Sequence, residues 1–430
     1  MSSRELIACL EGEEMGRVLQ SARGRLQFTY SEKWLESASA HPLSLSMPLQ
    51  KAPHPHRRID TFLWGLLPDN ASILRSWGQR FHASPANAFA LMSHVGEDCA
   101  GAVQFLSPEQ LDRTRAKRRE RVVWLSESEL GQRLRELRSD HAAWRLARDE
   151  GQFSLAGAQP KTAFLWENGR WGIPSGRIPT THILKPPNQH LEGFPENEHI
   201  CLRLAQSLGL PVAESRVMQF DGEVAIVITR YDRVRGTAGW KRVHQEDLCQ
   251  AMGVSPAKKY QSDGGPGARA ILDLLRAHSS AAAQDAETFV DTLGLSWLTA
   301  ATDGHAKNYS ILMGAGQQVR LAPIYDIASM VPYAQFDVNR VKLAMRIADR
   351  YRMQQVGLRE WRKLASELRL DADALVGRLA RMAREIPDRL AEIGREARVA
   401  GLEHPIIDRL IMRLGGRARL CAKQLGKSAG

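Results

Sequence analysis

The sequence predicts an α+β fold, with short strands in the first half of the chain and mostly helices in the second half. Runs such as EVAIVIT at residues 223–229 are short and β-branched, as strands are. Residues 285–302 and 361–400 instead place apolar side chains at helical spacing. The chain has 430 residues, of which 43% are hydrophobic, so it is long enough for two or three domains with sizeable cores.

Composition narrows the class of protein. The formal net charge of +11 and the pI near 9.6 favour an acidic partner, with nucleic acid as the first candidate, although solubility alone also explains such an excess. No apolar run approaches the roughly 20 residues that span a bilayer, and the N-terminus lacks a signal-peptide pattern. The five cysteines are scattered. We therefore expect a cytoplasmic protein that has no membrane partner and reduced, structural cysteines.

Residues 1–148 are expected to form an N-terminal α+β module. Its expected elements are short strands within 6–30, a strand at 43–49, an apolar run at 61–70 closed by a Pro-Asp turn, a helix over 86–94 and a strand at 102–106. Ser126 and Glu129 have the spacing of a capping box at the start of a further helix. Nothing in this module forms a recognisable catalytic set.

A second region, residues 149–236, carries a candidate phosphate loop. Two strands are expected within residues 152–174 around a turn at Asn168-Gly169. The small residues of the preceding loop would let backbone N–H groups approach a phosphate, although the loop is not a Walker A motif and could be an ordinary turn. The loop residues are Ala156, Gly157, Ala158, Gln159, Pro160 and Lys161.

Lys185 ends a short expected strand in THILKPP, and Glu198 begins a helix that is expected to end at Gly209. In kinases a strand lysine contacts the nucleotide phosphates and pairs with a helix glutamate. A lysine beside prolines is often merely exposed. The hypothesis that Lys185 and Glu198 form this pair is therefore supported only by their position after the small-residue loop.

Residues 237–430 are expected to be mostly helical, with helices at 244–252, 268–277, 285–302 and 361–400. The chemically informative stretch follows the third of these helices. Asp303 and Asn308 have the spacing D-x-x-x-x-N, and Asp326 follows two strands expected at 309–313 and 319–324. Phosphoryl transfer needs one carboxylate for the acceptor hydroxyl, together with a carboxamide and a carboxylate for Mg²⁺. Alone, the spacing could belong to an ordinary loop.

Together these parts have the order found in protein kinases. They predict a protein-kinase-like two-lobed fold with an additional N-terminal α+β module and a mostly helical C-terminal lobe. Asp303 would be catalytic, and Asn308 and Asp326 would bind Mg²⁺. The loop KYQSDGGPG, residues 259–267, could reach the mouth of the active site.

The chain resembles the HipA family of serine/threonine kinases, the toxin halves of type II toxin–antitoxin pairs. The resemblance covers nearly the whole chain. It rests on ordered blocks that include LSLSMPL, LLPDN, GEDCAGAVQ, SLAGAQPKTA, THILKPP, NEH, QEDLCQ, KYQSDGGPG, ATDGHAKNYS and APIYDIAS.

The resemblance implies roles for individual residues. Asp303 would be the catalytic residue, with Asn308 and Asp326 holding Mg²⁺ and His305 and Tyr325 near the nucleotide. The loop at residues 156–161 and Lys185 would contact the ATP phosphates. Ser154 matches a serine whose autophosphorylation expels this loop and inactivates the kinase. Without the resemblance it would be an ordinary strand serine.

The hinge block departs from the family pattern. It reads Thr229, Arg230, Tyr231, Asp232 and Arg233, whereas the family usually has an acidic residue at the first position. We expect Thr229, Arg230 and Tyr231 to line the nucleotide site. The departure puts nucleotide affinity in doubt if the usual acid makes a side-chain contact.

The resemblance also implies partners. These are a HipB-like helix-turn-helix antitoxin, operator DNA reached through that complex, and an aminoacyl-tRNA synthetase as substrate. The C-terminal arginines Arg378, Arg381 and Arg384 are candidate DNA contacts. Two other functions remain open: a DNA-bound corepressor whose kinase activity is weak or lost, and a small-molecule kinase.

Overall fold

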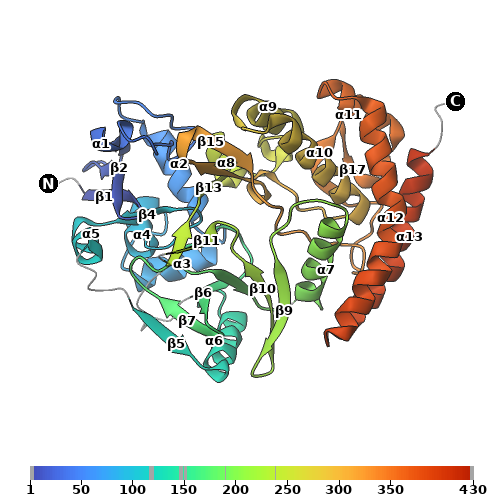
Figure 1. Cartoon of the computed structure of the whole chain (residues 1–430), viewed down its shortest axis with the longest axis horizontal. Coiled ribbons are helices and arrows are strands. Elements are labelled where there is room, and N and C mark those ends of the chain that lie inside the picture. The colour runs from blue at the N-terminus through green and yellow to red at the C-terminus, as the bar shows by residue number, and fades with distance from the viewer. Residues whose placement is uncertain are drawn as a thin grey trace. The chain divides into compact units, whose positions relative to one another are not determined.

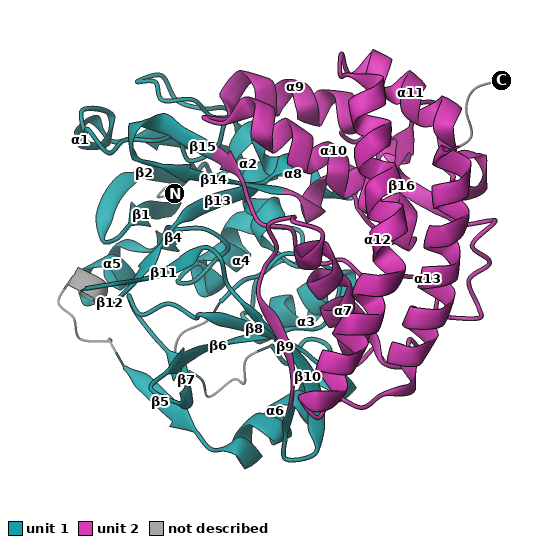
Figure 2. Ribbon diagram, turned by 45° about the vertical axis from the view of Figure 1, so that its right-hand side comes forward, with its two compact units in different colours: residues 1–186, 219–257, 310–319 teal, residues 187–218, 258–309, 320–430 magenta. Residues whose placement is uncertain are grey.

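Two units, each with its own set of elements, make up the chain (Figure 2). The computed structural model describes residues 4–115, 121–144, 149, 153–188, 190–237 and 239–426. Unit 1 comprises residues 1–186, 219–257 and 310–319, and unit 2 comprises residues 187–218, 258–309 and 320–430. Figure 2 shows most of the strands in unit 1 and a largely helical unit 2. The boundary expected at residue 148 lies outside the described residues.

The first part of unit 1 is an antiparallel sheet in the order β3-β2-β1-β4. Figure 1 labels three of its strands, β1, β2 and β4. The strands are β1 (Arg4–Leu10), β2 (Glu13–Gln20), β3 (Leu26–Tyr30) and β4 (Val103–Leu106). The helices are α1 (Glu32–Leu35), α2 (His56–Leu66), α3 (Ala71–Arg80), α4 (Ala88–Val95), α5 (Pro108–Arg115) and α6 (Glu127–Ser139). The capping box at Ser126 and Glu129 is confirmed.

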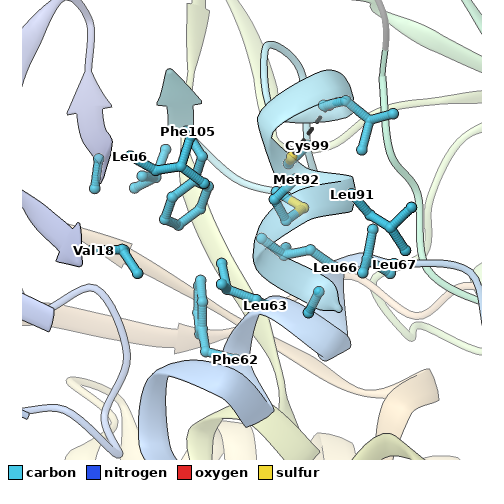
Figure 3. Close-up of a cluster of buried hydrophobic side chains, with 14 of the residues drawn as sticks. Leu6, Val18, Phe62, Leu63, Leu66, Leu67, Leu91, Met92, Cys99 and Phe105 are labelled. Atoms are coloured by element: carbon cyan, nitrogen blue, oxygen red, sulfur yellow. Dashed lines mark hydrogen bonds between the residues drawn. The ribbon is translucent and has the colours of Figure 1, made fainter. Parts of the chain in front are cut away.

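A buried apolar cluster joins this sheet to its helices. Figure 3 shows Leu6 and Val18 of the sheet facing Phe62 and Leu63 of α2, with Phe105 of β4 beside them. The apolar run that the sequence places before the Pro-Asp turn is thus a helix whose buried face packs on the sheet. The cluster continues to Leu66 and Leu67, at the end of α2. Its packing therefore fixes the segment that follows α2.

The second sheet of unit 1 contains neighbouring strands in the order β5-β7-β6-β8-β10. They are β5 (Val122–Leu125), β6 (Thr162–Glu167), β7 (Arg170–Pro174), β8 (His182–Lys185) and β10 (Glu223–Thr229). The predicted turn between β6 and β7 is confirmed, since Asn168 and Gly169 both adopt the left-handed conformation, with φ of 52° and 75°. Lys185 does end a short strand, as expected.

Two expected elements of unit 1 are wrong. Residues 43–49 form a turn closed by a bridge between Ser44 and Met47, and residues 244–252 begin as a strand, β13 (His244–Asp247), before the short helix α8 (Leu248–Ala251). The two segments bind each other. The Ser44 hydroxyl donates to the Gln250 carbonyl (3.2 Å). Contacts between residues about 200 positions apart in the sequence therefore override the strand and helix that the local patterns predict.

Glu246 of β13 is buried and accepts a hydrogen bond from the Leu45 backbone N–H (2.8 Å). Burial raises the pKa of this carboxyl to about 8, so the folded state retains a proton that the unfolded state loses above about pH 4.5. Stability should therefore fall as pH rises from about 4.5 to about 8. We expect Glu246→Gln to remove a few kcal/mol of this pH dependence. Melting temperatures of both proteins at pH 5 and pH 9 test this. Parallel pH curves would contradict it.

The remaining strands have three to six residues each. They are β9 (Ser215–Phe220), β11 (Arg233–Gly236), β12 (Gly239–Arg242), β14 (Ser310–Gly314), β15 (Gln318–Leu321), β16 (Lys342–Ile347) and β17 (Arg350–Arg352). β13 pairs antiparallel with β14, β11 with β12, and β16 with β17. The two strands expected after the D-x-x-x-x-N motif are thus present as β14 and β15.

Helices build most of unit 2. They are α7 (Phe194–Ser207), α9 (Ala268–His278), α10 (Ala282–Thr299), α11 (Leu358–Glu367), α12 (Ala372–Val399) and α13 (Pro405–Leu425). The expected helix over 361–400 is two helices, because Arg369 adopts the left-handed conformation after the end of α11 (φ of 54°) and Asp371 caps the start of α12. None of the helices in the described ranges is long and apolar enough to cross a membrane. All five cysteines are buried, and none of them forms a disulfide.

Candidate active site

The loop that carries Asp303 begins where α10 ends. Ala300 caps the helix in the left-handed conformation, with φ of 54°, so the helix stops three residues earlier than the sequence predicted. The Asp303 carbonyl then accepts hydrogen bonds from the His305 N–H (2.7 Å) and from Asn308 Nδ2 (2.8 Å). The two ends of the D-x-x-x-x-N motif thus hold each other. The Asp303 side chain remains exposed.

Neighbouring segments of unit 2 fix this loop from both sides. The Ala344 N–H of β16 donates to the Thr302 carbonyl (3.0 Å), and the Ala306 N–H donates to the Lys259 carbonyl (3.3 Å). Tyr260, the residue after Lys259, contacts Asp303, the candidate catalytic residue. The Tyr260 hydroxyl donates to Asp303 Oδ1 at 2.6 Å. The sequence placed this loop near the mouth of the site but did not single out Tyr260.

His305 lies on the same loop with its side chain only 3% exposed. Burial lowers its pKa, and the charge of Lys259 acts in the same direction, whereas Asp303 and Asp326 raise it. The ring is therefore neutral at physiological pH. Its Nδ1 has no hydrogen-bond partner within the described part of the chain. A buried nitrogen without a partner is costly unless a ligand satisfies it.

Asp326 adopts the left-handed conformation, with φ of 59°, which is uncommon for a residue other than glycine and gathers at functional sites. The segment before it is anchored, because the Ile324 N–H donates to the Pro211 carbonyl (2.8 Å) and the Tyr325 hydroxyl donates to the Lys307 carbonyl (2.8 Å). The Asp326 side chain is exposed. Both carboxylates act on the His305 ring, so unit 2 gathers Asp303, Asp326 and His305.

Asn197 of α7 holds the segment after Asp326, although no role was predicted for this residue. Its side chain is fully buried, donates to the Ser329 carbonyl (2.7 Å) and accepts from the Ser329 N–H (3.0 Å). The Ser329 hydroxyl in turn donates to the Thr299 carbonyl at the end of α10 (2.6 Å). One amide therefore joins α7 to the strained segment that presents Asp326. The sequence feature that could have indicated this role is the position of Asn197, a polar residue, on the buried face of a helix.

We expect Asn197→Ala to lower both stability and turnover. The change leaves the buried N–H and carbonyl of Ser329 without partners, at about 1–3 kcal/mol for each group. Melting temperature and the Mg²⁺ concentration for half-maximal activity measure the two effects. The exposed Asn339 of the same unit supplies the control variant Asn339→Ala. Equal melting temperatures and equal Mg²⁺ dependence for the two variants would refute the assignment.

In unit 1 the candidate phosphate loop is fastened to the segment after α2. The Asp69 N–H donates to the Gly157 carbonyl (3.1 Å), and the buried Ser154 hydroxyl donates to the Leu66 carbonyl (2.7 Å). Figure 3 shows Leu66 within the apolar cluster. The N-terminal part of the chain therefore contributes to holding this loop, although the sequence showed no catalytic set there.

The loop also has the local properties that a phosphate would use. Gly157 has φ of 107°, a backbone conformation that residues with a side chain rarely adopt, so glycine is favoured there. Lys161 folds back, with Nζ donating to the Ala156 carbonyl (3.0 Å) and lying over the Trp144 ring. The buried Gln159 Nε2 lacks a hydrogen-bond partner among the described residues.

Lys185 and Glu198 are both buried, Lys185 in unit 1 and Glu198 in unit 2. Both side chains take part in interactions. Their predicted pairing stays a prediction.

The hinge block is part of a buried ionic network in unit 1. The Arg230 guanidinium donates to Asp232 (2.8 and 3.0 Å) and to the Cys99 carbonyl, while its backbone N–H donates to Thr181. Burial opposes the ionisation of Asp98, but the arginines around it, Arg233 first, hold the pKa of that carboxyl well below its usual range. Arg230 therefore supports the hinge, and its contact with a nucleotide stays a prediction, as do those of Thr229 and Tyr231.

The three candidate DNA-binding arginines of α12 differ in their surroundings. Arg378 is mostly buried and forms an ion pair with Asp291 (3.0 Å). Arg381 is 63% exposed, with Glu385 at 4.0 Å, and Arg384 is exposed. Arg381 and Arg384 are thus the more accessible candidates, because a DNA contact by Arg378 would have to break its ion pair.

Two family models match this chain, one in its N-terminal part and one in its C-terminal part. The family model of the HipA-like C-terminal domain matches residues 153–390, and that of the HipA N-terminal domain matches residues 6–106.

Similar proteins span nearly the same length. The putative kinase Y4mE of Sinorhizobium fredii is 34% identical over 424 residues, which cover 98% of this chain and 99% of that protein. The serine/threonine-protein kinase toxin HipA of Shewanella oneidensis is 31% identical over 85% of this chain and 83% of that protein. The solved complex of Shewanella oneidensis HipA, HipB and operator DNA includes a chain with a TM-score of 0.82, at 26% identity and 98% coverage of both chains.

Proposed function

The chain belongs to the HipA family of serine/threonine kinases, and we propose that it transfers the γ-phosphoryl group of ATP to a serine of a protein, as the toxin of a toxin–antitoxin pair. One observation carries the chemical part of this proposal. Asp303 presents an exposed carboxylate from a loop that its own carbonyl, His305 and Asn308 hold in place. Such a carboxylate can accept the proton of a substrate hydroxyl.

The residues fit a magnesium ion held jointly with phosphate oxygens. Asn308 uses its amide nitrogen on the Asp303 carbonyl, which leaves its amide oxygen for a metal, and Asp326 adds an exposed carboxylate. Oxygen ligands of this kind, few in number, are what Mg²⁺ uses beside nucleotides. The bound ion would neutralise charge on the phosphates. The chain would contribute by holding the two candidate metal ligands, Asn308 and Asp326, at fixed backbone positions.

The proposed ATP contacts rest on two unsatisfied groups. Gln159 Nε2 in the loop of unit 1 and His305 Nδ1 in the loop of unit 2 are buried atoms for which the described ranges offer no partner. In each unit, taken by itself, a polar ligand such as a phosphate would satisfy the buried group. Lys161 and Lys185 would add positive charge at the phosphates, and Thr229 and Tyr231 would contact the adenine.

We propose that Ser154 is autophosphorylated and that this inactivates the enzyme. The observation in support is the buried hydroxyl, which donates to the Leu66 carbonyl. A phosphate there would carry about two negative charges against a carbonyl oxygen inside an apolar cluster. The fastened loop is incompatible with that charge, so modification would release it.

The proposed partners are a HipB-like antitoxin and operator DNA. The Shewanella HipA chain of similar structure is part of a complex with HipB and operator DNA, and the accessible Arg381 and Arg384 here suit phosphate contacts. Operator binding by the purified toxin–antitoxin complex at several salt concentrations tests this. Replacing both arginines by alanine should lower the salt dependence of binding. An unchanged slope would remove these residues from the proposal.

For the substrate we propose an aminoacyl-tRNA synthetase, so that phosphorylation arrests translation and growth. The experiment is incubation of the purified chain with labelled ATP, Mg²⁺ and a dephosphorylated translation extract from its host. Label on a serine of a synthetase supports the proposal. Label on a small molecule alone would replace it with the small-molecule kinase.

A further inference from the structure

Tyr260 contacts the Asp303 carboxylate directly, and the proposed mechanism does not use it. Its hydroxyl donates to Asp303 Oδ1 at 2.6 Å. Its ring meets the His305 ring edge-on, with centroids 4.9 Å apart and planes at 82°. One side chain thus contacts two residues of the catalytic loop.

The turn around Tyr260 is built to keep this side chain in place. The Asp263 and Gly265 N–H groups both donate to the Tyr260 carbonyl (3.0 Å each). Gly265 lies so close to the Lys258 carbonyl that an added Cβ would be 2.0 Å from that oxygen, so no other residue fits there.

Two further bonds tie the turn to its surroundings. One is the bond from the Ala306 N–H to the Lys259 carbonyl. The other runs from the Arg346 N–H to Gln261 Oε1 (2.9 Å). The residues on either side of Tyr260 are therefore anchored, and its hydroxyl has little freedom to leave Asp303.

The chemistry of the pair sets the direction of the hydrogen bond. A phenol is a far weaker acid than a carboxylic acid, so the proton stays on Tyr260 and the carboxylate accepts. Oδ1 of Asp303 is then occupied. Oδ2 is the oxygen left to face an acceptor hydroxyl.

We propose that Tyr260 is a positioning residue that orients the Asp303 carboxylate for proton transfer, an inference that rests on the proposed function. In the step it supports, the serine O–H proton passes to Asp303 Oδ2 and the serine oxygen bonds to the γ-phosphorus. The bond from that phosphorus to the β–γ bridging oxygen breaks, and ADP leaves with the electron pair. Misorientation of a catalytic group by about 1 Å costs on the order of 100-fold in rate.

The test is Tyr260→Phe, which removes one oxygen and keeps the ring against His305. We expect kcat to fall by about 10- to 100-fold while the KM for ATP and the melting temperature stay unchanged. Tyr351→Phe on β17 is the matched control, because that hydroxyl makes no hydrogen bond within the described ranges. It should retain the wild-type kcat.

A second background separates positioning from a general structural role. With Asp303→Asn already present, adding Tyr260→Phe should cause no further loss, because the carboxylate it orients is gone. A full kcat in Tyr260→Phe, or an equal loss in both backgrounds, would overturn the inference alone. A wild type without any turnover would overturn the proposed function, and this inference with it.

Discussion

Asp303→Asn is expected to reduce phosphoryl transfer by at least about 100-fold, since a positioned general base contributes on the order of 100- to 10,000-fold. The amide has the size of the carboxylate but cannot take the proton of the acceptor hydroxyl. Its oxygen can still accept the hydrogen bond from Tyr260, and the Asp303 backbone contacts do not involve the side chain. The fold should therefore survive. The measurement is the multiple-turnover rate of ADP release with a protein acceptor.

A matched control comes from the same unit. Asp273 on α9 is 61% exposed, and Asp273→Asn should leave the rate and the melting temperature unchanged. A variant Asp303→Asn that keeps more than half of the wild-type turnover would exclude Asp303 as the base. Loss of the folded state in that variant would instead show a structural role for the side chain.

Ser154→Asp is expected to weaken ATP binding by at least about tenfold. The serine hydroxyl donates to the Leu66 carbonyl in a fully buried position, whereas a carboxylate has no proton to donate and would face that oxygen without water. The segment 154–157 should then leave the Leu66–Asp69 backbone. Because the candidate phosphate loop is continuous with this segment, ATP affinity should fall. Isothermal titration with a nonhydrolysable ATP analogue measures it.

Two variants separate loop release from general damage. Ser154→Ala loses a single hydrogen bond, worth about 0.5–1.5 kcal/mol, and should keep ATP affinity within about twofold. Ser175 is also buried and donates to the Arg121 carbonyl (3.2 Å) at the end of β7. Ser175→Asp should therefore lower the melting temperature without weakening ATP binding as Ser154→Asp does. Equal ATP affinities for Ser154→Asp and Ser175→Asp would contradict the loop mechanism.

Local signals explain which elements could be predicted. The hairpin at Asn168-Gly169, the capping box at Ser126 and strand β10 each depend on residues within a few positions of one another. Residues 43–49 and 244–247 depend instead on each other across about 200 residues. Residues 43–49 were predicted as a strand and residues 244–252 as a helix, because neither local pattern shows the distant partner.

The residues of the candidate site also fall into two groups, those that the sequence could predict and those that it could not. Asp303, Asn308 and Asp326 could be proposed because their chemistry demands those residue types at that spacing. Tyr260 and Asn197 could not, since a tyrosine in a turn and an asparagine on a helix are common and gain meaning only from their partners. The fastening of Ser154 to Leu66 likewise appears only once α2 has packed.

We propose that this chain is an active kinase whose Asp303 drives transfer and whose Ser154 receives phosphate. The most direct measurement is the intact mass of dephosphorylated protein after incubation with ATP and Mg²⁺, beside Asp303→Asn. We expect one added phosphate, mapped to Ser154 and absent from the variant. An unchanged mass without ADP formation, or equal phosphate on both proteins, would contradict it.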